Sequence, residues 1–169
     1  MNIFILDLDP KISARYLCNA HVSKMIVESG QMLSTAHRLM SDYTDGLYKP
    51  AHINHPSTIW TRESIENYRW HYKYFCCMAD EFEERYGRPH LTFLLLKERL
   101  QLPPEKIIKI ERTPFPQCMP DHYKHDDPVK AYRAFYIGDK FKFAHWSLPA
   151  TVPFWILEKV RKSNATKSI

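Results

Sequence analysis

The amino-acid sequence predicts an all-α fold, a compact single-domain helical bundle with a proline-rich irregular segment before its last long helix. Apolar residues recur at helical spacing over long stretches, only 4 glycines occur in 169 residues, and no segment alternates apolar and polar residues as a strand does. The composition, 44% hydrophobic and 25% charged, is that of a globular domain large enough to bury a core. We therefore expect residues 1–169 to form one domain.

The first long helix follows a short apolar start. Residues 1–6 are expected to form an extended segment or a buried tail. Asp9-Pro10 has the pattern of an N-cap followed by a first-turn proline, and over residues 11–40 only Gly30 disfavours a helix. Residues 41–55 are rich in Asp, Gly, Pro and Asn, which predicts a loop.

Two more helices are expected before the proline-rich segment. Residues 57–86 place aromatic side chains at helical spacing, and Gly87 and Pro89 end this helix. Residues 92–100 predict a shorter helix, which Pro103-Pro104 stops.

The last third of the chain begins with the irregular segment. Residues 105–124 are rich in proline and are expected to wrap around the body of the fold. Asp127-Pro128 repeats the N-cap and proline pattern and starts a helix that reaches about residue 146. Residues 153–161 predict a short helix, and residues 162–169 a frayed tail.

The sequence gives no sign of export or of a membrane. No apolar run approaches the roughly 18–20 residues of a membrane span, and no basic region precedes the apolar start. The four cysteines are interpreted as unpaired thiols, because two are adjacent and two are isolated. We expect a cytoplasmic protein.

Charge and aromatic content point towards nucleic acid. The net charge is +5, and 14% of the residues are aromatic, many of them next to a basic residue. Such pairs suit stacking on bases with contact to phosphates. Aromatic residues also fill buried helix faces, and both interpretations stay open.

The helix over residues 11–40 carries a polar stripe. Its apolar residues form one arc, which faces the core, and Ser23, Gly30 and Ser34 form an arc small enough for another helix to approach. The remaining face holds one carboxylate among cationic and amide side chains, which suits a general acid or base in an anion-binding groove. A solvated face is the alternative. The stripe consists of His21, Lys24, Glu28, Gln31, Thr35 and Arg38.

Other candidates lie near the start of the second long helix and in a proline-bounded loop. His55 and Arg62 are near a helix N-terminus, where backbone N–H groups attract phosphate. Gln117, Tyr123 and Lys124 lie in a loop that is too polar for the core, and we expect them to line the same groove.

A metal site is not predicted. The spacing His52-x-x-His55 offers two metal ligands, but no third ligand is near them in the sequence. The chain also lacks a Walker loop, a glycine-rich dinucleotide turn, a Ser-His-Asp signature and zinc-finger spacing.

In their order along the chain, these residues resemble a family of small proteins common in phage genomes. More distantly, the chain is similar to the pyrimidine-dimer DNA glycosylases of the endonuclease V type. In both, an apolar start leads to a helix bearing His21 and, seven residues later, Glu28. The other matching positions are Pro56 to Ile59, Pro116-Gln117, Tyr123, Asp139-Lys140 and Phe154-Trp155.

The resemblance implies an all-helical domain that needs no cofactor and whose nucleophile is the chain's own α-amine. Asn2 is large enough that the initiator methionine usually stays, so the amine is that of Met1. By position, Glu28 matches the assisting acid, and His21 lies on the same helix face. The residues expected to contact DNA are Lys24, Gln31, Arg38, His55, Arg62, Gln117, Tyr123 and Lys124.

The chemistry that the resemblance implies is coherent. An α-amine has an ordinary pKa of about 8 and a lysine amine one of about 10.4, so more of the α-amine is unprotonated at neutral pH. An amine next to a carboxylate is a known route to covalent catalysis without a metal. The target base must leave the stack to be reached.

The expected function is therefore a DNA glycosylase with AP lyase activity that excises a damaged or modified base. The expected partner is double-stranded DNA, the expected state a monomer, and the expected location the cytoplasm, that of a host cell if a phage encodes the protein. Three alternatives stay open. They are another nucleic-acid-modifying phage enzyme that uses the same pocket, a non-catalytic DNA-binding module, and a metal-dependent hydrolase built on the histidines.

Overall fold

The computed structural model describes residues 1–166, with side chains described through residue 161. Within this range the chain is all-α and contains no strand, as the sequence predicts. The elements are α1 (Pro10–Tyr16), α2 (Asn19–Met40), α3 (Pro56–Glu63), α4 (Ile65–Tyr86), α5 (Leu91–Leu100), the short 3₁₀ turn η1 (Asp121–Tyr123), α6 (Pro128–Phe135), the π-helical segment η2 (Tyr136–Lys140), the 3₁₀ turn η3 (Phe141–Phe143) and α7 (Phe154–Thr166).

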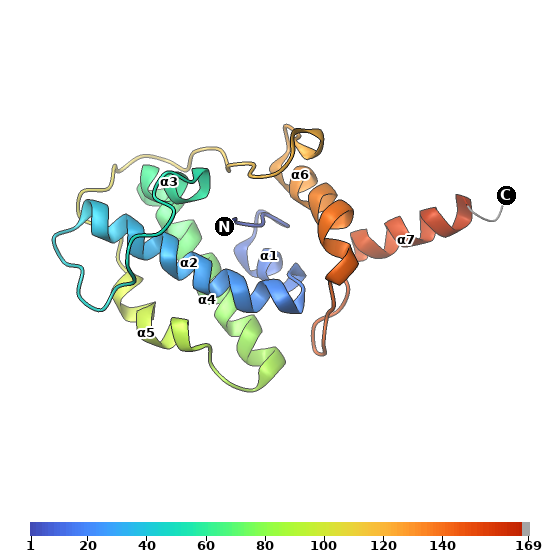
Figure 1. Ribbon diagram of the computed structural model, residues 1–169, viewed down its shortest axis with the longest axis horizontal. Helices are drawn as coiled ribbons and strands as arrows, with labels where there is room; N and C mark the ends of the chain where they lie inside the picture. The colour runs from blue at the N-terminus through green and yellow to red at the C-terminus, as the bar shows by residue number, and fades with distance from the viewer. Residues whose placement is uncertain (167–169) are drawn as a thin grey trace.

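Helices α2 and α4 form the centre of the molecule, with α1, α3 and α5 packed around them (Figure 1). The apolar arc predicted for α2 is buried in the core, and α4 adds fully buried aromatic side chains such as Tyr68, Tyr74 and Phe75. The N-terminus lies between α3 and α6 (Figure 1). The first residues of the chain therefore pack against the two long central helices, with Asn2 bonded to Glu28 of α2 and Phe4 to Tyr74 of α4.

The first long helix of the prediction is two helices, separated at Leu17 and Cys18. Leu17 has an extended backbone, and both residues are fully buried. Distant partners stabilise the break: Tyr136 accepts the Cys18 N–H at 2.9 Å, and Arg85 donates to the Leu17 carbonyl at 2.8 Å. The expectation of an unbroken helix was wrong because these long-range contacts satisfy the backbone groups that a continuous helix would pair internally.

The second long helix is also divided, at Ser64. The Ser64 side chain caps α4 by accepting the Asn67 N–H at 3.1 Å, and the Ile65 N–H donates to the Ile108 carbonyl at 2.9 Å. The sequence predicts one helix over residues 57–86, and it is divided because the Ser64 side chain supplies an N-cap for a new helix.

Gly30 is the point at which α5 approaches α2 closely. A Cβ at Gly30 would lie 2.9 Å from both Leu96 Cδ1 and Thr92 Cγ2. This contact confirms that the small-residue arc allows another helix to approach. It also explains why α2 continues through a residue that disfavours helices.

The helix expected from Pro128 to about residue 146 ends at Phe135 and continues as the π-helical segment η2 and the turn η3. A Cβ on Gly138, within η2, would collide with the ring of Tyr123. The close approach of Tyr123 therefore requires glycine in η2. Lys140, at the end of η2, lines a pocket together with Met1.

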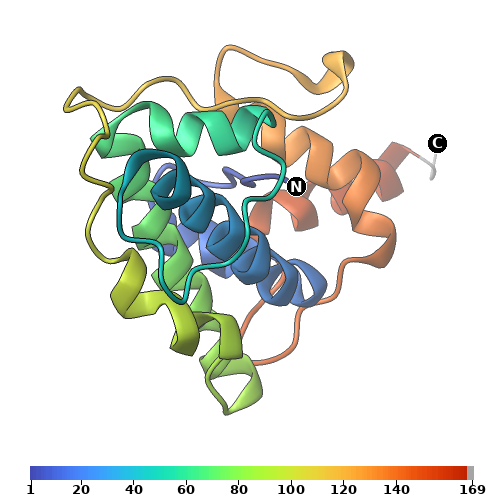
Figure 2. The same cartoon turned by 60° about the vertical axis from the view of Figure 1, so that its left-hand side comes forward.

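The proline-rich segment wraps the body, as predicted, and Figure 2 shows it running over α3 towards α6. Trp60 of α3 donates to the Thr113 carbonyl at 3.2 Å, and the Tyr132 hydroxyl of α6 donates to the Pro116 carbonyl at 2.7 Å. These bonds connect the α3 side of the molecule to the α6 side around the N-terminus.

Helix α7 points away from the rest of the molecule (Figure 1). Its first turn is attached to the body, where Trp155 and Ile156 are buried. The helix extends to Thr166, into the stretch where the sequence predicts a frayed tail, and residues 167–169 of that tail lie outside the described residues. No helix in the described part of the chain is long and apolar enough to cross a membrane. All four cysteines are free.

Candidate active site

The first residues of the chain form a buried, extended segment. Ile3 to Leu6 are almost completely buried, and side chains satisfy part of their backbone: Ser13 Oγ and the Tyr74 hydroxyl both donate to the Phe4 carbonyl, at 3.0 and 3.1 Å. The Leu6 N–H in turn donates to Ser13 Oγ at 3.0 Å. Because this segment is fixed by specific hydrogen bonds, the position of the chain start is fixed as well.

The α-amine of Met1 lies next to Glu28, the residue that the family resemblance implies as the assisting acid. The amine nitrogen is 3.7 Å from Glu28 Oε2, and the peptide N–H of Asn2 donates to the same oxygen at 3.0 Å. The Met1 side chain is buried, with its sulfur accepting from the Thr58 hydroxyl of α3 at 3.3 Å. The position of the amine is therefore fixed by two contacts, the Asn2 N–H bond to Glu28 and the bond of the Thr58 hydroxyl to the Met1 sulfur.

Two lysines place positive charge around this pair. Lys24 Nζ lies 3.4 Å from Glu28 Oε1, and the Lys24 side chain is 68% exposed, so it extends from the site into solvent. Lys140, from η2, lies over the Phe135 ring at 4.5 Å from its centroid. The α-amine, Lys24 and Lys140 thus share one pocket with a single carboxylate, an arrangement suited to a substrate that carries phosphates.

His21 lies at the inner end of the same site. Its Nδ1 is 2.7 Å from the Tyr136 hydroxyl, and its ring stacks on Phe4 with centroids 4.5 Å apart. Burial lowers the pKa of His21 to about 4, with smaller contributions from the charges of Lys140 and Lys24. His21 is thus a neutral imidazole at physiological pH.

These groups line one pocket of about 200 Å³. Its walls come from the N-terminal segment, α2, the end of α6 and η2, so segments far apart in the sequence meet here. The lining residues are Met1, Asn2, Phe4, His21, Lys24, Met25, Glu28, Phe135 and Lys140. The pocket combines an amine, a carboxylate, a neutral imidazole and aromatic faces in a volume that fits one sugar or base.

His55 is the N-cap residue of α3 and lies close enough to the pocket to interact with the charges of the N-terminal amine and Glu28. Its Nδ1 accepts the Ser57 N–H at 3.2 Å and so caps α3. Burial lowers the pKa of His55, the charges of the N-terminal amine and His52 lower it further, and the charge of Glu28 acts in the opposite direction. Arg62 is two turns further along α3, and its Nη1 is buried without a hydrogen-bond partner in the described chain.

Other predicted DNA-contacting residues of α2 lie outside the pocket lining. Arg38 donates to the carbonyls of Tyr48 and Leu47, at 2.6 and 2.7 Å, and so anchors the loop between α2 and α3. Gln31 is half-buried, and the stripe residue Thr35 is fully buried, where its hydroxyl accepts the Ala51 N–H at 3.0 Å. The stripe is therefore split, with its first half at the pocket and its second half holding a loop.

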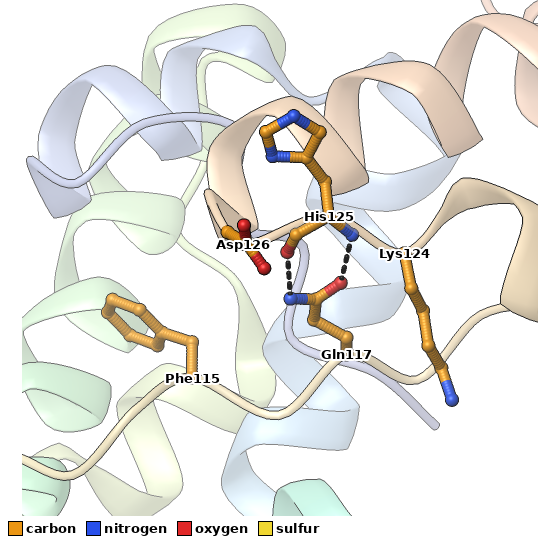
Figure 3. A pocket seen from close by; sticks show the side chains of 5 residues that line it. All are labelled: Phe115, Gln117, Lys124, His125 and Asp126. Carbon is orange, nitrogen blue, oxygen red and sulfur yellow. Dashed lines mark hydrogen bonds between the residues drawn. The ribbon is translucent and has the colours of Figure 1, made fainter.

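Gln117 and Lys124 line a separate, wider hollow of about 520 Å³ with Phe115, His125 and Asp126. Figure 3 shows Gln117 facing the backbone of His125: its Nε2 donates to the His125 carbonyl at 2.6 Å, and its Oε1 accepts the His125 N–H at 3.0 Å. The Gln117 amide therefore closes a loop. Lys124 points out from this loop (Figure 3) and forms an ion pair with Asp121 at 2.7 Å.

Tyr123, the remaining candidate, contacts Asp139 and Phe135 and does not itself line the pocket. Its hydroxyl donates to Asp139 Oδ1 at 3.0 Å, and its ring contacts Phe135 with centroids 5.4 Å apart. Because Phe135 lines the pocket, Tyr123 stabilises one of its walls.

Sequence reasoning missed several residues of the pocket. Asn2, Phe4, Phe135 and Lys140 line it, and Tyr136 bonds to His21. Asp139-Lys140 enters the resemblance only by its order along the chain, and no spacing rule joins it to α2. Among the described residues, no group of three or more His, Cys, Asp and Glu side chains is placed to hold a metal ion.

Comparison with known proteins identifies the family. The family model described as pyrimidine dimer DNA glycosylase matches residues 1–94, which is more than half of the chain and includes Met1, His21, Lys24 and Glu28. No curated protein and no solved structure matches the chain. The pocket around the chain start and the family match agree, and the chain belongs to the pyrimidine dimer DNA glycosylase family.

Proposed function

We propose that this protein is a DNA glycosylase with AP lyase activity, which excises a damaged or modified base through an imine formed by its N-terminal amine. One observation carries the proposal: the α-amine of Met1 lies 3.7 Å from the Glu28 carboxylate, inside a pocket with an excess of positive charge. The family match supports DNA as the substrate.

The first half of the reaction exchanges the base for the amine. The unprotonated amine attacks C1′ of the deoxyribose with its lone pair, and the bond from C1′ to the base breaks, with its electron pair leaving on the base. The new secondary amine then loses a proton, the bond from C1′ to the ring oxygen breaks, and that oxygen gains a proton. Glu28 lies within reach of the amine to carry this proton, and the product is a protonated imine.

The second half cleaves the strand. A general base removes a proton from C2′. The electron pair of that C–H bond forms a double bond between C2′ and C3′, the bond from C3′ to its oxygen breaks, and the 3′ phosphate leaves with the electron pair of the broken bond. Water then hydrolyses the imine and restores the amine. Glu28, the sole carboxylate lining the pocket, is the group assigned to this proton abstraction.

Phosphate contacts would position the strand around this chemistry. Lys24 lies 3.4 Å from Glu28, and both Lys24 and Lys140 line the pocket. The DNA-contacting roles of Gln31, Arg38, His55, Arg62, Gln117, Tyr123 and Lys124 stay predictions, and Arg38 and Gln117 have intramolecular partners that such a role would have to replace.

The test is to trap the imine. Wild-type protein is incubated with duplex oligonucleotides that carry a pyrimidine dimer, other damaged or modified bases, or a preformed abasic site, and borohydride is added. We expect a covalent protein–DNA adduct and strand cleavage. In Glu28→Gln, cleavage should fall by two or more orders of magnitude, about 3 kcal/mol of barrier, while DNA affinity stays level or rises slightly.

A matched control separates charge from chemistry. Glu83 is an exposed glutamate near the end of α4, so Glu83→Gln makes the same change of charge and should cleave like wild type. Glu28 is 9% exposed, so the fold of Glu28→Gln must be verified by its unfolding midpoint. A folded Glu28→Gln that cleaves as fast as Glu83→Gln would exclude Glu28 as the catalytic acid or base.

A further inference from the structure

The two nitrogens of the His21 ring have different surroundings. Nδ1 is turned inward, 2.7 Å from the Tyr136 hydroxyl oxygen, and this oxygen also accepts the peptide N–H of Cys18 at 2.9 Å. Burial raises the pKa of Tyr136 well above its ordinary value, so the hydroxyl keeps its proton at physiological pH. The phenol therefore has one proton to donate.

That proton points to His21. The other neighbour able to accept it is the thiol of Cys18, and sulfur is a weak acceptor, whereas an imidazole nitrogen at 2.7 Å is a strong one. Nδ1 is then an acceptor and carries no hydrogen. In a neutral imidazole the hydrogen must be on the other nitrogen, so Tyr136 and the Cys18 backbone fix His21 as the Nε2–H tautomer.

With Nδ1 paired to Tyr136, Nε2 is the ring nitrogen left to interact with the pocket that His21 lines. The two ring nitrogens point in diverging directions, so the bond from Nδ1 to Tyr136 leaves Nε2 pointing away from that hydroxyl. Phe4 covers one face of the ring, and the ring of Phe143 packs edge-on at 5.6 Å between centroids, so the imidazole has little freedom to turn. The charged groups around it are the Met1 amine, Lys24, Glu28 and Lys140, and none of these forms a hydrogen bond with Nε2.

We propose that His21 is a fixed, neutral hydrogen-bond donor that stabilises the departing base, through Nε2–H to the O2 oxygen of a pyrimidine. When the bond from C1′ to N1 breaks, its electron pair is shared between N1 and O2 of the leaving pyrimidine. A preorganised donor at O2 interacts more strongly with this anion than with the intact base, which lowers the barrier. His21 transfers no proton, and the base gains its proton from water. Tyr136 is a positioning residue, acting through His21.

This role rests on the proposed function, and it concerns base departure alone. Cleavage at a preformed abasic site involves the same amine and the same Glu28 but no departing base. The ratio of the two rates, excision of a pyrimidine dimer and cleavage at an abasic site in the same duplex, therefore isolates the role of His21. Both rates are measured in single-turnover reactions.

Two substitutions at His21 separate the N–H group from the ring. His21→Phe keeps a ring against Phe4 but removes the donor, and we expect the ratio to fall about tenfold or more. His21→Gln keeps an N–H group at a similar distance from the backbone and should stay within about threefold of wild type. The wild-type ratio should also be constant from pH 5.5 to 8, whereas a general acid would make it fall as pH rises.

Nitrogen-15 spectra of histidine-labelled protein without DNA test the tautomer itself. The His21 signals, assigned by their loss in His21→Gln, should show a protonated Nε2 and an unprotonated Nδ1 from pH 5.5 to 8. Tyr136→Phe should abolish this fixed pattern and lower the rate ratio towards that of His21→Phe.

The outcomes distinguish the two proposals. If wild-type protein neither forms a trapped adduct nor cleaves any substrate, the proposed function and this role both fail. If wild type cleaves both substrates and His21→Phe has the wild-type ratio, the role of His21 fails and the imine mechanism stands. A charged imidazole, or an Nδ1–H tautomer, would also overturn it.

Discussion

The peptide N–H of Asn2 donates to Oε2 of Glu28 at 3.0 Å, and the α-amine of Met1 lies 3.7 Å from the same oxygen. One carboxylate thus holds the first two nitrogens of the chain. The Asn2 side chain adds to this attachment, since its Nδ2 donates to the Cys118 carbonyl at 2.9 Å. The site therefore fixes the chain start rather than a single amine.

An N-terminal extension of a few residues should abolish borohydride trapping, because it removes the α-amine from Glu28. Protein that has lost Met1 should still trap DNA, since the Asn2 nitrogen would become the amine at a site already within hydrogen-bond distance. Intact mass and peptide mapping of the adduct check both outcomes. Proteolytic removal of the extension is the control and should restore trapping. An adduct formed by the extended protein would point to another amine, such as that of Lys24.

The salt dependence of DNA binding should depend on Lys24 and Lys140. If each lysine neutralises one phosphate, the double substitution to Ala flattens the slope of log K against log salt by about 1.8, because each contact with duplex DNA contributes about 0.9. Titrations from 50 to about 300 mM salt measure the slope. Lys97 and Lys106 lie outside the pocket lining, and their double substitution is the charge-matched control. Equal slopes in the two double variants would place the binding face elsewhere.

Arg38 should matter for stability more than for DNA binding. Its guanidinium donates to two carbonyls of the loop between α2 and α3, so Arg38→Ala should lower the free energy of unfolding by about 2–3 kcal/mol. Arg38→Lys keeps the charge but loses the paired geometry, and it should be destabilised as well. Urea unfolding measures both variants. A stable Arg38→Ala with a flatter salt slope would instead support the phosphate contact predicted from the sequence.

Acid should destabilise the fold through its buried histidines. Burial lowers the pKa of His71 to about 3 and that of His21 to about 4, both from the ordinary histidine value of 6.5. The unfolded chain therefore binds more protons below pH 6.5, so stability is complete above that pH and is lost as pH falls towards these values. The loss per histidine is about 1.4 kcal/mol per pH unit.

The variant His71→Gln tests the acid effect, because His71 is fully buried between Thr61 and Ser29. Between pH 6.5 and 4.5, its free energy of unfolding should fall less steeply than that of wild type, by about 1.4 kcal/mol per pH unit. Urea unfolding at several pH values provides the measurement. The exposed His122 supplies the control, and His122→Gln should keep the wild-type slope.

The sequence by itself determined the helical class and which polar side chains share one face of α2. Residue spacing places His21, Lys24 and Glu28 on one side of a helix whatever surrounds it, because 3.6 residues per turn is a local property. The apolar start likewise predicts a buried N-terminal segment. The expectation that the α-amine acts together with Glu28 came from the family resemblance, and packing of the N-terminal segment against α2 brings the two groups together.

Only the tertiary structure decided where the helices break and which groups complete the pocket. The breaks at Leu17–Cys18 and at Ser64 depend on Tyr136, Arg85 and Ile108, which are far away in sequence. Tertiary packing also brings Lys140 to the pocket, places the Tyr136 hydroxyl 2.7 Å from Nδ1 of His21, and directs the Arg38 guanidinium to the carbonyls of Leu47 and Tyr48. Side-chain spacing fixes a helix face, but the partner that meets that face is selected by packing and by the need to satisfy buried polar groups.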